Sequence, residues 1–268
     1  MDNPVADRVK AYWEDRAQAR QDVASTTDDV YLRELEVSTL IKVLGDAGLP
    51  SGASILDVGC GDGWSTIRIA QAFPRISFHG IDFSANMIEL ATKRLIGQEL
   101  ADRVSFAVGD ATALDSACGD AVFDAVLTDR CLINLTSLER QALATSQIAA
   151  HLKPGGLYVA IENFMEGQDK MNAIRSSMGL SEIPVRWHNL YFTEDGFRRI
   201  TDPSFEELKL SDFASSYYFA TRVIYSSMCQ MRNEKPNYRH EIHQLAVKLP
   251  SVGGFSPIKM AVLRKRAK

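Results

Sequence analysis

The chain has 268 residues, 46% of them hydrophobic and 24% charged, which suits one α/β domain with insertions. Its net charge of −4 gives no general attraction to a polyanion, so the composition disfavours a nucleic-acid partner. No apolar run reaches the roughly 20 residues that cross a bilayer, and the start of the chain lacks a basic, apolar signal sequence. The four cysteines have no metal-like spacing, so we expect free thiols, as in a reducing compartment. Together with the absence of a long apolar run, this predicts no membrane span and a cytoplasmic location.

The first fifty residues are predicted to be helical. Val5–Ala19 and Asp28–Ala47 both carry apolar residues at helical spacing, and the second segment stops at Gly48-Leu49-Pro50. We therefore expect residues 1–50 to form a helical unit ahead of the main sheet.

A buried strand then runs into a glycine-rich turn at Ile55–Gly63. The turn has the spacing G-x-G-x-G, with Asp57 two residues before the first glycine, and the helix Ser65–Phe73 is expected after it, starting near Trp64. Glycine permits backbone angles and close ligand approach that a β-carbon would block. An α/β sheet presents nucleotide-like ligands at this carboxyl edge, so the pattern indicates such a site.

Further strands follow in an order that strengthens this prediction. Two of them, Ser77–Ile81 and Val104–Val108, lead directly into acids, Asp82 and Asp110. The strand Phe123–Asp129 comes next, and Leu152–Gly156 is predicted to be a helix exit before a fifth strand. Taken singly, each acid is also typical of a helix N-cap or a solvated turn.

The ordered array over residues 51–163 resembles the class I S-adenosylmethionine (SAM) dependent methyltransferases. The resemblance implies a Rossmann-like sheet with SAM as cofactor, Asp82 on the ribose hydroxyls and Asp110 near the adenine amine. It also implies that Phe83 and Met87 enclose the adenine, although both also fit as core residues at helical spacing. The predicted cofactor-binding residues are Tyr12, Trp13, Arg33, Asp57, Gly59, Gly61, Asp82, Phe83, Met87, Asp110, Ala111 and Arg130.

The N-terminal helices are implied to be a lid, since such helices commonly cover the cofactor in this family. Tyr12, Trp13 and Arg33 resemble lid residues that reach the methionine end of SAM. The alternatives are ordinary packing for Trp13 and a surface ion pair for Arg33. Asp57 is buried by its strand context, so we expect a backbone or ligand partner for its carboxylate.

Residues 164–268 are predicted to complete the sheet and to form the substrate side. A minimal methyltransferase core would need only one helix and a hairpin, here Glu206–Leu210 with Ile258–Leu263. Two segments are additional: Phe164–Phe192, and Ser215–Ser256 with the helix-like Arg239–Lys248. We expect both to fold over the catalytic mouth, within one structural domain overall.

Arg130 follows the fourth strand, where this family faces the sulfonium methyl. The D/N-P-P-Y/F tetrad typical of N-methylating enzymes is absent there, and a guanidinium suits a carboxylate, phosphate or carbonyl. The alternative is pairing with Asp129 or a helix acid. Arg186 and Arg222, from the two insertions, extend the predicted anion-recognition site. The predicted substrate-binding residues are Arg130, Asn163, Arg186, His188, Tyr191, Tyr218 and Arg222.

The runs R-C-L-I-N-L, W-H-N-L-Y-F and P-S-V-G-G-F-S-P-I-K resemble methyltransferases of bacterial surface-polysaccharide clusters. This resemblance implies O-methylation of a polar or anionic small-molecule or glycan-type acceptor. His188 is the predicted base, because an unperturbed imidazole titrates near neutrality, and Arg130 is the second predicted catalytic residue. A structural hydrogen-bonding role for His188 is the alternative, and a carboxylate or phosphate acceptor needs no base. No metal constellation is evident.

Two other functions share parts of this pattern. An NAD-dependent oxidoreductase also has a strand, glycines and a later acid, but it expects G-x-G-x-x-G, and Trp64 stands at the third glycine. A non-catalytic SAM-fold partner protein usually has a degraded ligand loop, whereas this loop is intact. Both remain alternatives to a methyltransferase, and the oligomeric state stays open.

Overall fold

A seven-stranded sheet forms the centre of the protein in a computed structural model, which describes residues 4–22 and 24–267. The strand order is β3-β2-β1-β4-β5-β7-β6. The first five strands in this order, β3, β2, β1, β4 and β5, pair in parallel. Strand β7 runs antiparallel between β5 and β6. The strands are β1 Ser54–Val58, β2 Ser77–Asp82, β3 Val104–Val108, β4 Phe123–Asp129, β5 Leu152–Asn163, β6 Phe205–Ser211 and β7 Ile258–Lys265. The predicted Rossmann-like class is confirmed.

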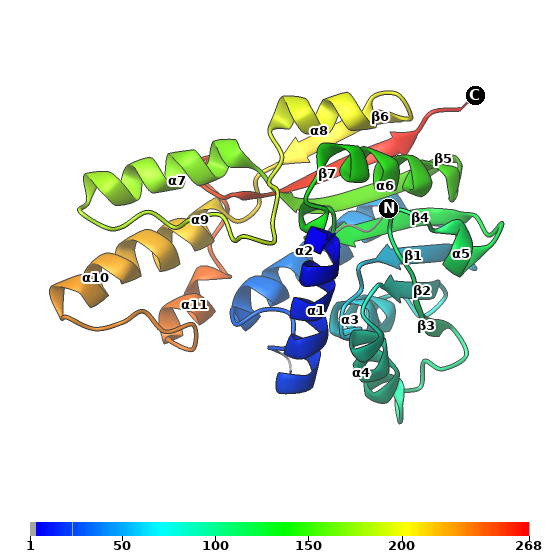
Figure 1. Cartoon of the computed structure of the whole chain (residues 1–268), viewed down its shortest axis with the longest axis horizontal. Coiled ribbons are helices and arrows are strands. Elements are labelled where there is room, and N and C mark those ends of the chain that lie inside the picture. The colour runs from blue at the N-terminus through cyan, green and yellow to red at the C-terminus, as the bar shows by residue number, and fades with distance from the viewer. Residues whose placement is uncertain (1–3, 23, 268) are drawn as a thin grey trace.

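Helices cover both faces of this sheet (Figure 1). The α-helices are α1 Pro4–Ala19, α2 Val30–Ala47, α3 Trp64–Ala72, α4 Ala85–Leu95, α5 Asp115–Cys118, α6 Leu138–Ala150, α7 Met165–Ser177, α8 Glu194–Thr201, α9 Ser215–Tyr218, α10 Tyr225–Met231 and α11 Glu241–Ala246. A short 3-10 turn, Leu132–Asn134, follows β4, and a π-helix, Phe219–Ile224, joins α9 to α10.

Alternation along β1 shows how the strands build two cores. Ile55 belongs to the apolar cluster that also holds Leu40 of α2 and Ile67 of α3. Its neighbour Leu56 faces the opposite side, in the cluster that holds Phe197 of α8. Because successive side chains point to opposite faces, a strand buried on both sides is mainly apolar, and Ile55, Leu56 and Val58 of β1 are all buried.

Several predicted boundaries differ from the structure. The second N-terminal helix begins at Val30 rather than Asp28, because the Asp29 carboxylate accepts a hydrogen bond from the Leu32 N–H and so caps the helix. The segment Leu152–Gly156 is not a helix exit: helix α6 ends at Ala150, and Leu152 already pairs with β4. The predicted helix Arg239–Lys248 is shorter and spans Glu241–Ala246.

The two additional segments gather beside the sheet rather than lengthening it. In Figure 1, α7, α9, α10 and α11 form a lobe at the left of the view, next to α1 and α2. The π-helix in this lobe has wider turns than an α-helix, a feature common at functional sites. The lobe therefore lies against the helices predicted to be the lid.

We expect Gly167→Ala to destabilise the protein strongly. An added Cβ at Gly167 of α7 would lie 1.8 Å from the Ser256 carbonyl oxygen, which is rigid backbone. The expected loss in the free energy of unfolding is about 3 kcal/mol. Gly45→Ala is the matched control, because Gly45 is also helical and nothing lies within 4 Å of its added Cβ. For this variant we expect the free energy of unfolding to increase by about 0.5 kcal/mol. Chemical denaturation measures both, and equal effects would contradict the packing argument.

Candidate cofactor and acceptor cavity

A cavity of about 690 Å³ opens at the carboxyl edge of the parallel strands. Its size lies within the range of small-molecule sites. All but one of the predicted site residues line it. They are Trp13, Arg33, Asp57, Gly59, Gly61, Asp82, Phe83, Met87, Asp110, Ala111, Arg130, Asn163, Arg186, His188, Tyr191, Tyr218 and Arg222. The exception is Tyr12, which does not line the cavity and instead stacks on His188, with ring centroids 4.5 Å apart.

The glycine turn forms the floor of one end of the cavity, the cofactor end. Gly59 and Gly61 have φ angles of +78° and +55°, which disfavour residues that carry a β-carbon. Asp82, at the end of β2, accepts hydrogen bonds from the N–H groups of Gly61 and Ser84, both at 2.9 Å. Burial raises the pKa of Asp82 to about 6, against these two bonds. Each oxygen keeps a further lone pair for a ligand hydroxyl.

The rest of the cofactor end is largely apolar. Met87 is buried, whereas Phe83 and Ala111 are half-buried, and all three line the cavity. Asp110 is exposed and also makes the local turn bonds, accepting from the N–H and the hydroxyl of Thr112. Its two predicted roles, turn acid and cavity residue, are therefore compatible.

Asp57 has a side-chain partner in place of the expected backbone partner, and a ligand partner stays a prediction. Its carboxylate accepts a hydrogen bond from the Thr66 hydroxyl of α3. Burial raises the pKa of Asp57 to about 7, despite this bond. Asp57 therefore ties β1 to α3 beneath the glycine turn while also lining the cavity.

Asp62, between the two last glycines of the turn, is a structural anchor that the sequence analysis missed. Its carboxylate is buried, accepts a hydrogen bond from the Ser25 hydroxyl and forms ion pairs with Arg33 and Arg94. Burial opposes its ionisation, but the charge of Arg33 leads the effects that lower the pKa of Asp62. Arg33 is thus neither on the surface nor simply a cofactor ligand: it lines the cavity and holds α2 against the glycine turn. The acid within G-D-G was the available signal.

Arg130 lies where β4 ends, and it pairs with a helix acid, as the alternative interpretation held. Its Nη2 donates to Glu36 of α2 at 2.9 Å, and its Nε lies 3.7 Å from Asp129. Glu36 is fully buried, and this burial raises its pKa well above the usual range. Arg130 also has a φ of +53°, a conformation that costs a non-glycine residue about 1–3 kcal/mol and is frequent at functional sites.

The other two predicted anion-binding arginines differ in their surroundings. Arg222, on the π-helix, pairs with the buried Asp29, and its guanidinium lies 4.9 Å from the Tyr238 ring. Arg186 lines the cavity from the loop after α7 and is exposed. Of these two arginines that line the cavity, Arg222 has its charge compensated by an acid, and Arg186 is exposed to solvent.

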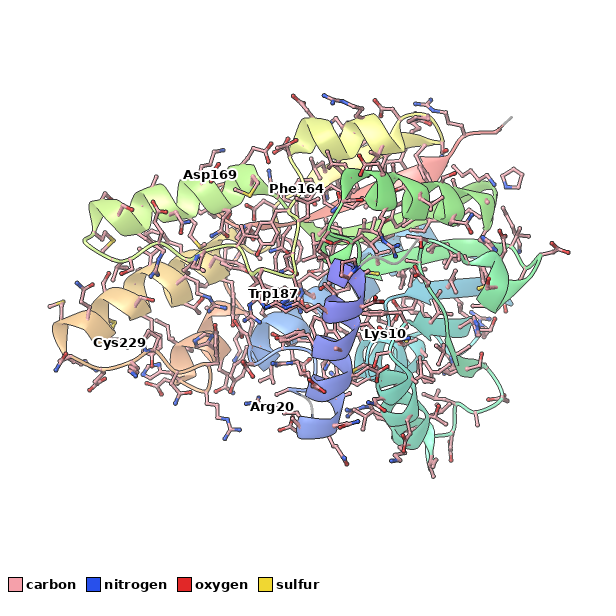
Figure 2. The ribbon with its side chains drawn as sticks, viewed as in Figure 1. Lys10, Arg20, Phe164, Asp169, Trp187 and Cys229 are labelled. Atoms are coloured by element: carbon pink, nitrogen blue, oxygen red, sulfur yellow. The ribbon has the colours of Figure 1, made fainter. Side chains whose placement is uncertain are left out.

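His188 lies within an aromatic cluster between α1 and the loop after α7. It contacts the rings of Tyr12, Trp13 and Trp187, and Figure 2 labels Trp187 in this loop, beside α1. Burial, followed by the charge of Arg186, lowers the pKa of His188 to about 4. The near-neutral pKa on which its predicted catalytic role rested is therefore wrong, because neighbours that the sequence cannot place remove water from the ring.

Several buried polar atoms around the cavity have no hydrogen-bond partner among the described residues. They include Asp129 Oδ1, Arg130 Nε, Asn163 Oδ1 and His188 Nδ1, and all four residues line the cavity. An unsatisfied buried polar atom costs about 1–3 kcal/mol, and functional sites are a common reason to retain one. These four atoms mark a second end of the cavity, the acceptor end, that suits a polar ligand.

The residues at the cofactor end fit SAM. A carboxylate with free lone pairs ends β2, two glycines open the backbone, and apolar side chains lie where the adenine would bind. Among the residues that the structure describes, no three His, Cys, Asp or Glu side chains group to hold a metal ion. All four cysteines are free thiols.

Comparison with known proteins agrees with this geometry. Residues 55–156 match the family model described as a methyltransferase domain. The chain is 35% identical over 148 residues to the O-methyltransferase cnsE of Penicillium expansum, covering 55% of this chain and 48% of that protein. It is 25% identical over 173 residues to a malonyl-[acyl-carrier protein] O-methyltransferase of Halalkalibacterium halodurans, covering 63% and 61%. The chain spans about half the length of the curated relatives it matches.

Solved structures show the same fold. A magnesium protoporphyrin IX methyltransferase from Synechocystis, solved with bound SAH, superposes with a TM-score of 0.62 at 16% identity, covering 98% of both chains. The [4+2]-cyclase SpnF superposes with a TM-score of 0.56 at 23% identity, covering 86% of this chain and 81% of that one.

Residues 55–156 therefore match a methyltransferase domain, and the chain shares the fold of a methyltransferase solved with bound SAH. The oxidoreductase alternative has no support from these matches. Within the described residues, no helix is both long and apolar enough to cross a membrane.

Proposed function

We propose that this protein transfers the methyl group of SAM to an oxygen of a polar or anionic small-molecule or glycan-type acceptor. The acceptor would be of the kind handled in bacterial surface-polysaccharide clusters, and no nucleic acid is involved. The observation that carries the proposal is the cavity that joins the Asp82 end to the Arg130, Asn163 and Tyr218 end. The O-methyltransferase named among the similar proteins also supports it.

Three segments of the chain line this cavity, and each has a different proposed role. Residues 51–163 bind the cofactor, residues 1–50 cover it, and residues 164–268 supply most of the acceptor end. When bound, SAM supplies an activated methyl group for in-line displacement. The protein then has mainly to orient the acceptor oxygen, an effect that can contribute about 7–11 kcal/mol to catalysis.

Arg130 and Asn163 are the proposed orienting groups at the ends of β4 and β5. Among the described residues, neither Arg130 Nε nor Asn163 Oδ1 has a hydrogen-bond partner, although Arg130 Nε lies 3.7 Å from the Asp129 carboxylate. Together they offer one donor and one acceptor to a hydroxyl group and its neighbour. Tyr191 and Tyr218 add aromatic surface, and burial raises the pKa of both, so they remain neutral phenols. This combination favours a polar acceptor over a purely apolar one.

His188 is proposed to accept the proton of an acceptor hydroxyl. Its lowered pKa keeps the ring neutral above about pH 5, and it also makes the imidazole a weaker base. The variant His188→Ala should therefore reduce the rate of methyl transfer roughly 10²-fold, which is the lower end of the effect of a positioned base. In the wild type, titration of His188 should cause no rise or fall of the methyl-transfer rate between pH 6 and 8. A loss under threefold would assign His188 to packing and favour a pre-ionised carboxylate or phosphate acceptor.

Transfer of a tritiated methyl group tests the whole proposal. The purified protein is incubated with methyl-labelled SAM and, separately, with free sugars, nucleotide sugars and small carboxylic acids. We expect label in an oxygen-linked product and SAH formation with at least one acceptor class, and mild alkali separates methyl esters from ethers. Since the fold also supports other chemistry, SAM binding with no methyl transfer would indicate a different activity. Absence of SAM binding would contradict the cofactor site itself.

A further inference from the structure

The positive charge of Arg222 is already compensated within the acceptor end of the cavity. Its Nη2 donates to the Asp29 carboxylate, whose side chain is only 5% exposed. The same guanidinium lies over the rings of Tyr238 and Tyr218, at 4.9 and 5.3 Å from their centroids. Arg222 therefore lines the cavity as part of a neutral ion pair held between aromatic rings.

Asp29 joins two regions that are distant in the sequence. One carboxylate oxygen caps α2 through the Leu32 N–H, at 3.1 Å, and also accepts from the Tyr217 hydroxyl. Tyr217 in turn shares a hydrogen bond of 2.8 Å with His243 Nδ1. Burial opposes ionisation of Asp29, but the His243 hydrogen bond and the Arg222 charge outweigh it and lower the pKa of Asp29 well below its usual range.

We propose that Asp29 is a positioning residue: it fixes the direction of Arg222 and cancels its charge, so that this part of the cavity takes an uncharged polar group of the acceptor. This inference rests on the proposed function, because it concerns the acceptor end of the same cavity. An anionic group of the acceptor would instead lie near Arg186, which is exposed to solvent. The two arginines thus have different roles, although both line one cavity.

Asp29→Asn separates this role from helix capping. Asparagine is as good an N-cap as aspartate, so the cap is retained while the negative charge is lost. The probe is inorganic phosphate, titrated calorimetrically into protein saturated with SAH. We expect Asp29→Asn to bind phosphate at least tenfold more tightly than the wild type, because Arg222 is left uncompensated. The double variant Asp29→Asn, Arg222→Met should lose this gain.

Asp46→Asn is the matched control. Asp46 is exposed near the end of α2, so the same change of charge there should leave phosphate affinity unchanged. Equal phosphate affinity in the wild type and in Asp29→Asn would overturn the proposal and leave Asp29 as a helix cap only. If Asp29→Asn does not fold, folding of the double variant supports the pairing, and failure of both overturns it. SAH affinity is measured throughout, so an unbound cofactor would contradict the proposed function and not this inference.

Discussion

Asp82→Ala should weaken the binding of SAM and SAH by about 1.5–3 kcal/mol, or roughly 10–150-fold. The Asp82 carboxylate already accepts the Gly61 and Ser84 N–H groups, and it faces the cavity with free lone pairs for the ribose hydroxyls. The alanine variant loses those ligand bonds and also frees the glycine turn. Asp82→Asn, which retains one acceptor oxygen, should have an intermediate affinity. Isothermal titration with SAH measures all three proteins.

Asp102→Ala is the control for this series. Asp102 is an exposed turn acid before β3, so the same truncation there should leave the SAH affinity within twofold of wild type. Circular dichroism must show that the Asp82 variants are folded. Unchanged SAH affinity in a folded Asp82→Ala protein would remove the ribose assignment, and with it the basis for placing the cofactor at this end of the cavity.

Arg130→Met should lower the free energy of unfolding by about 3 kcal/mol at pH 8, because it leaves Glu36 buried without its cation. Arg68→Met is the control, because Arg68 of α3 also pairs with an acid of α2. Arg68 pairs with Glu34 at 3.3 Å, but both side chains are nearly half exposed, so its loss should cost less than about 1 kcal/mol. Urea denaturation compares the two variants.

The pH dependence of the Arg130→Met deficit provides a second measurement. Burial already raises the pKa of Glu36, and removal of the cation raises it further. A carboxyl group whose folded pKa exceeds its unfolded value loses stability as pH rises from the unfolded pKa toward the folded one. This loss begins at the same unfolded pKa in both proteins but continues to higher pH in the variant, so the deficit should grow as the pH rises above the folded pKa of Glu36 in the wild type. A constant deficit would show that lost packing, not the unpaired carboxylate, is responsible.

The double variant Arg130→Met, Glu36→Gln separates stability from function. It removes the buried charge together with its partner, so most of the stability should return. SAH binding should remain nearly intact in this protein, while methyl transfer or acceptor affinity should stay depressed. Full activity in the stable double variant would restrict Arg130 to a structural role.

The sheet and the glycine turn could be predicted because their signals are local. A parallel strand buried on both faces is a continuous apolar run, and the turn needs glycines at fixed positions. The strands Val104–Val108 and Phe123–Asp129 were predicted with the bounds that the structure has, although Val104–Val108 lies at the edge of the sheet and is only partly buried. Acids at the ends of such strands reach the same edge, which explains why Asp82 and Asp110 line one cavity.

Partners distant in the sequence could not be predicted in this way. The sequence shows an arginine at 130 and another at 222, but not that α2 and its N-cap residue supply a buried acid for each of them. Tyr12 shows a simpler limit. Neighbouring residues on a helix point about 100° apart, so when Trp13 faces the cavity, Tyr12 must turn elsewhere, here onto His188.

The charged face of α2 has a consequence for the order of folding. Asp29, Arg33 and Glu36 each pair with a residue of another region, and the pair formed by Asp29 and Arg222 is separated by 193 positions. The entropy of closing so long a loop must be overcome before such a pair contributes. The sheet can assemble from nearer contacts, whereas the pair between Asp29 and Arg222 forms only when the last insertion is in place. We therefore expect a cofactor site that matures after the sheet itself, and refolding chains that acquire secondary structure before they acquire affinity for SAH.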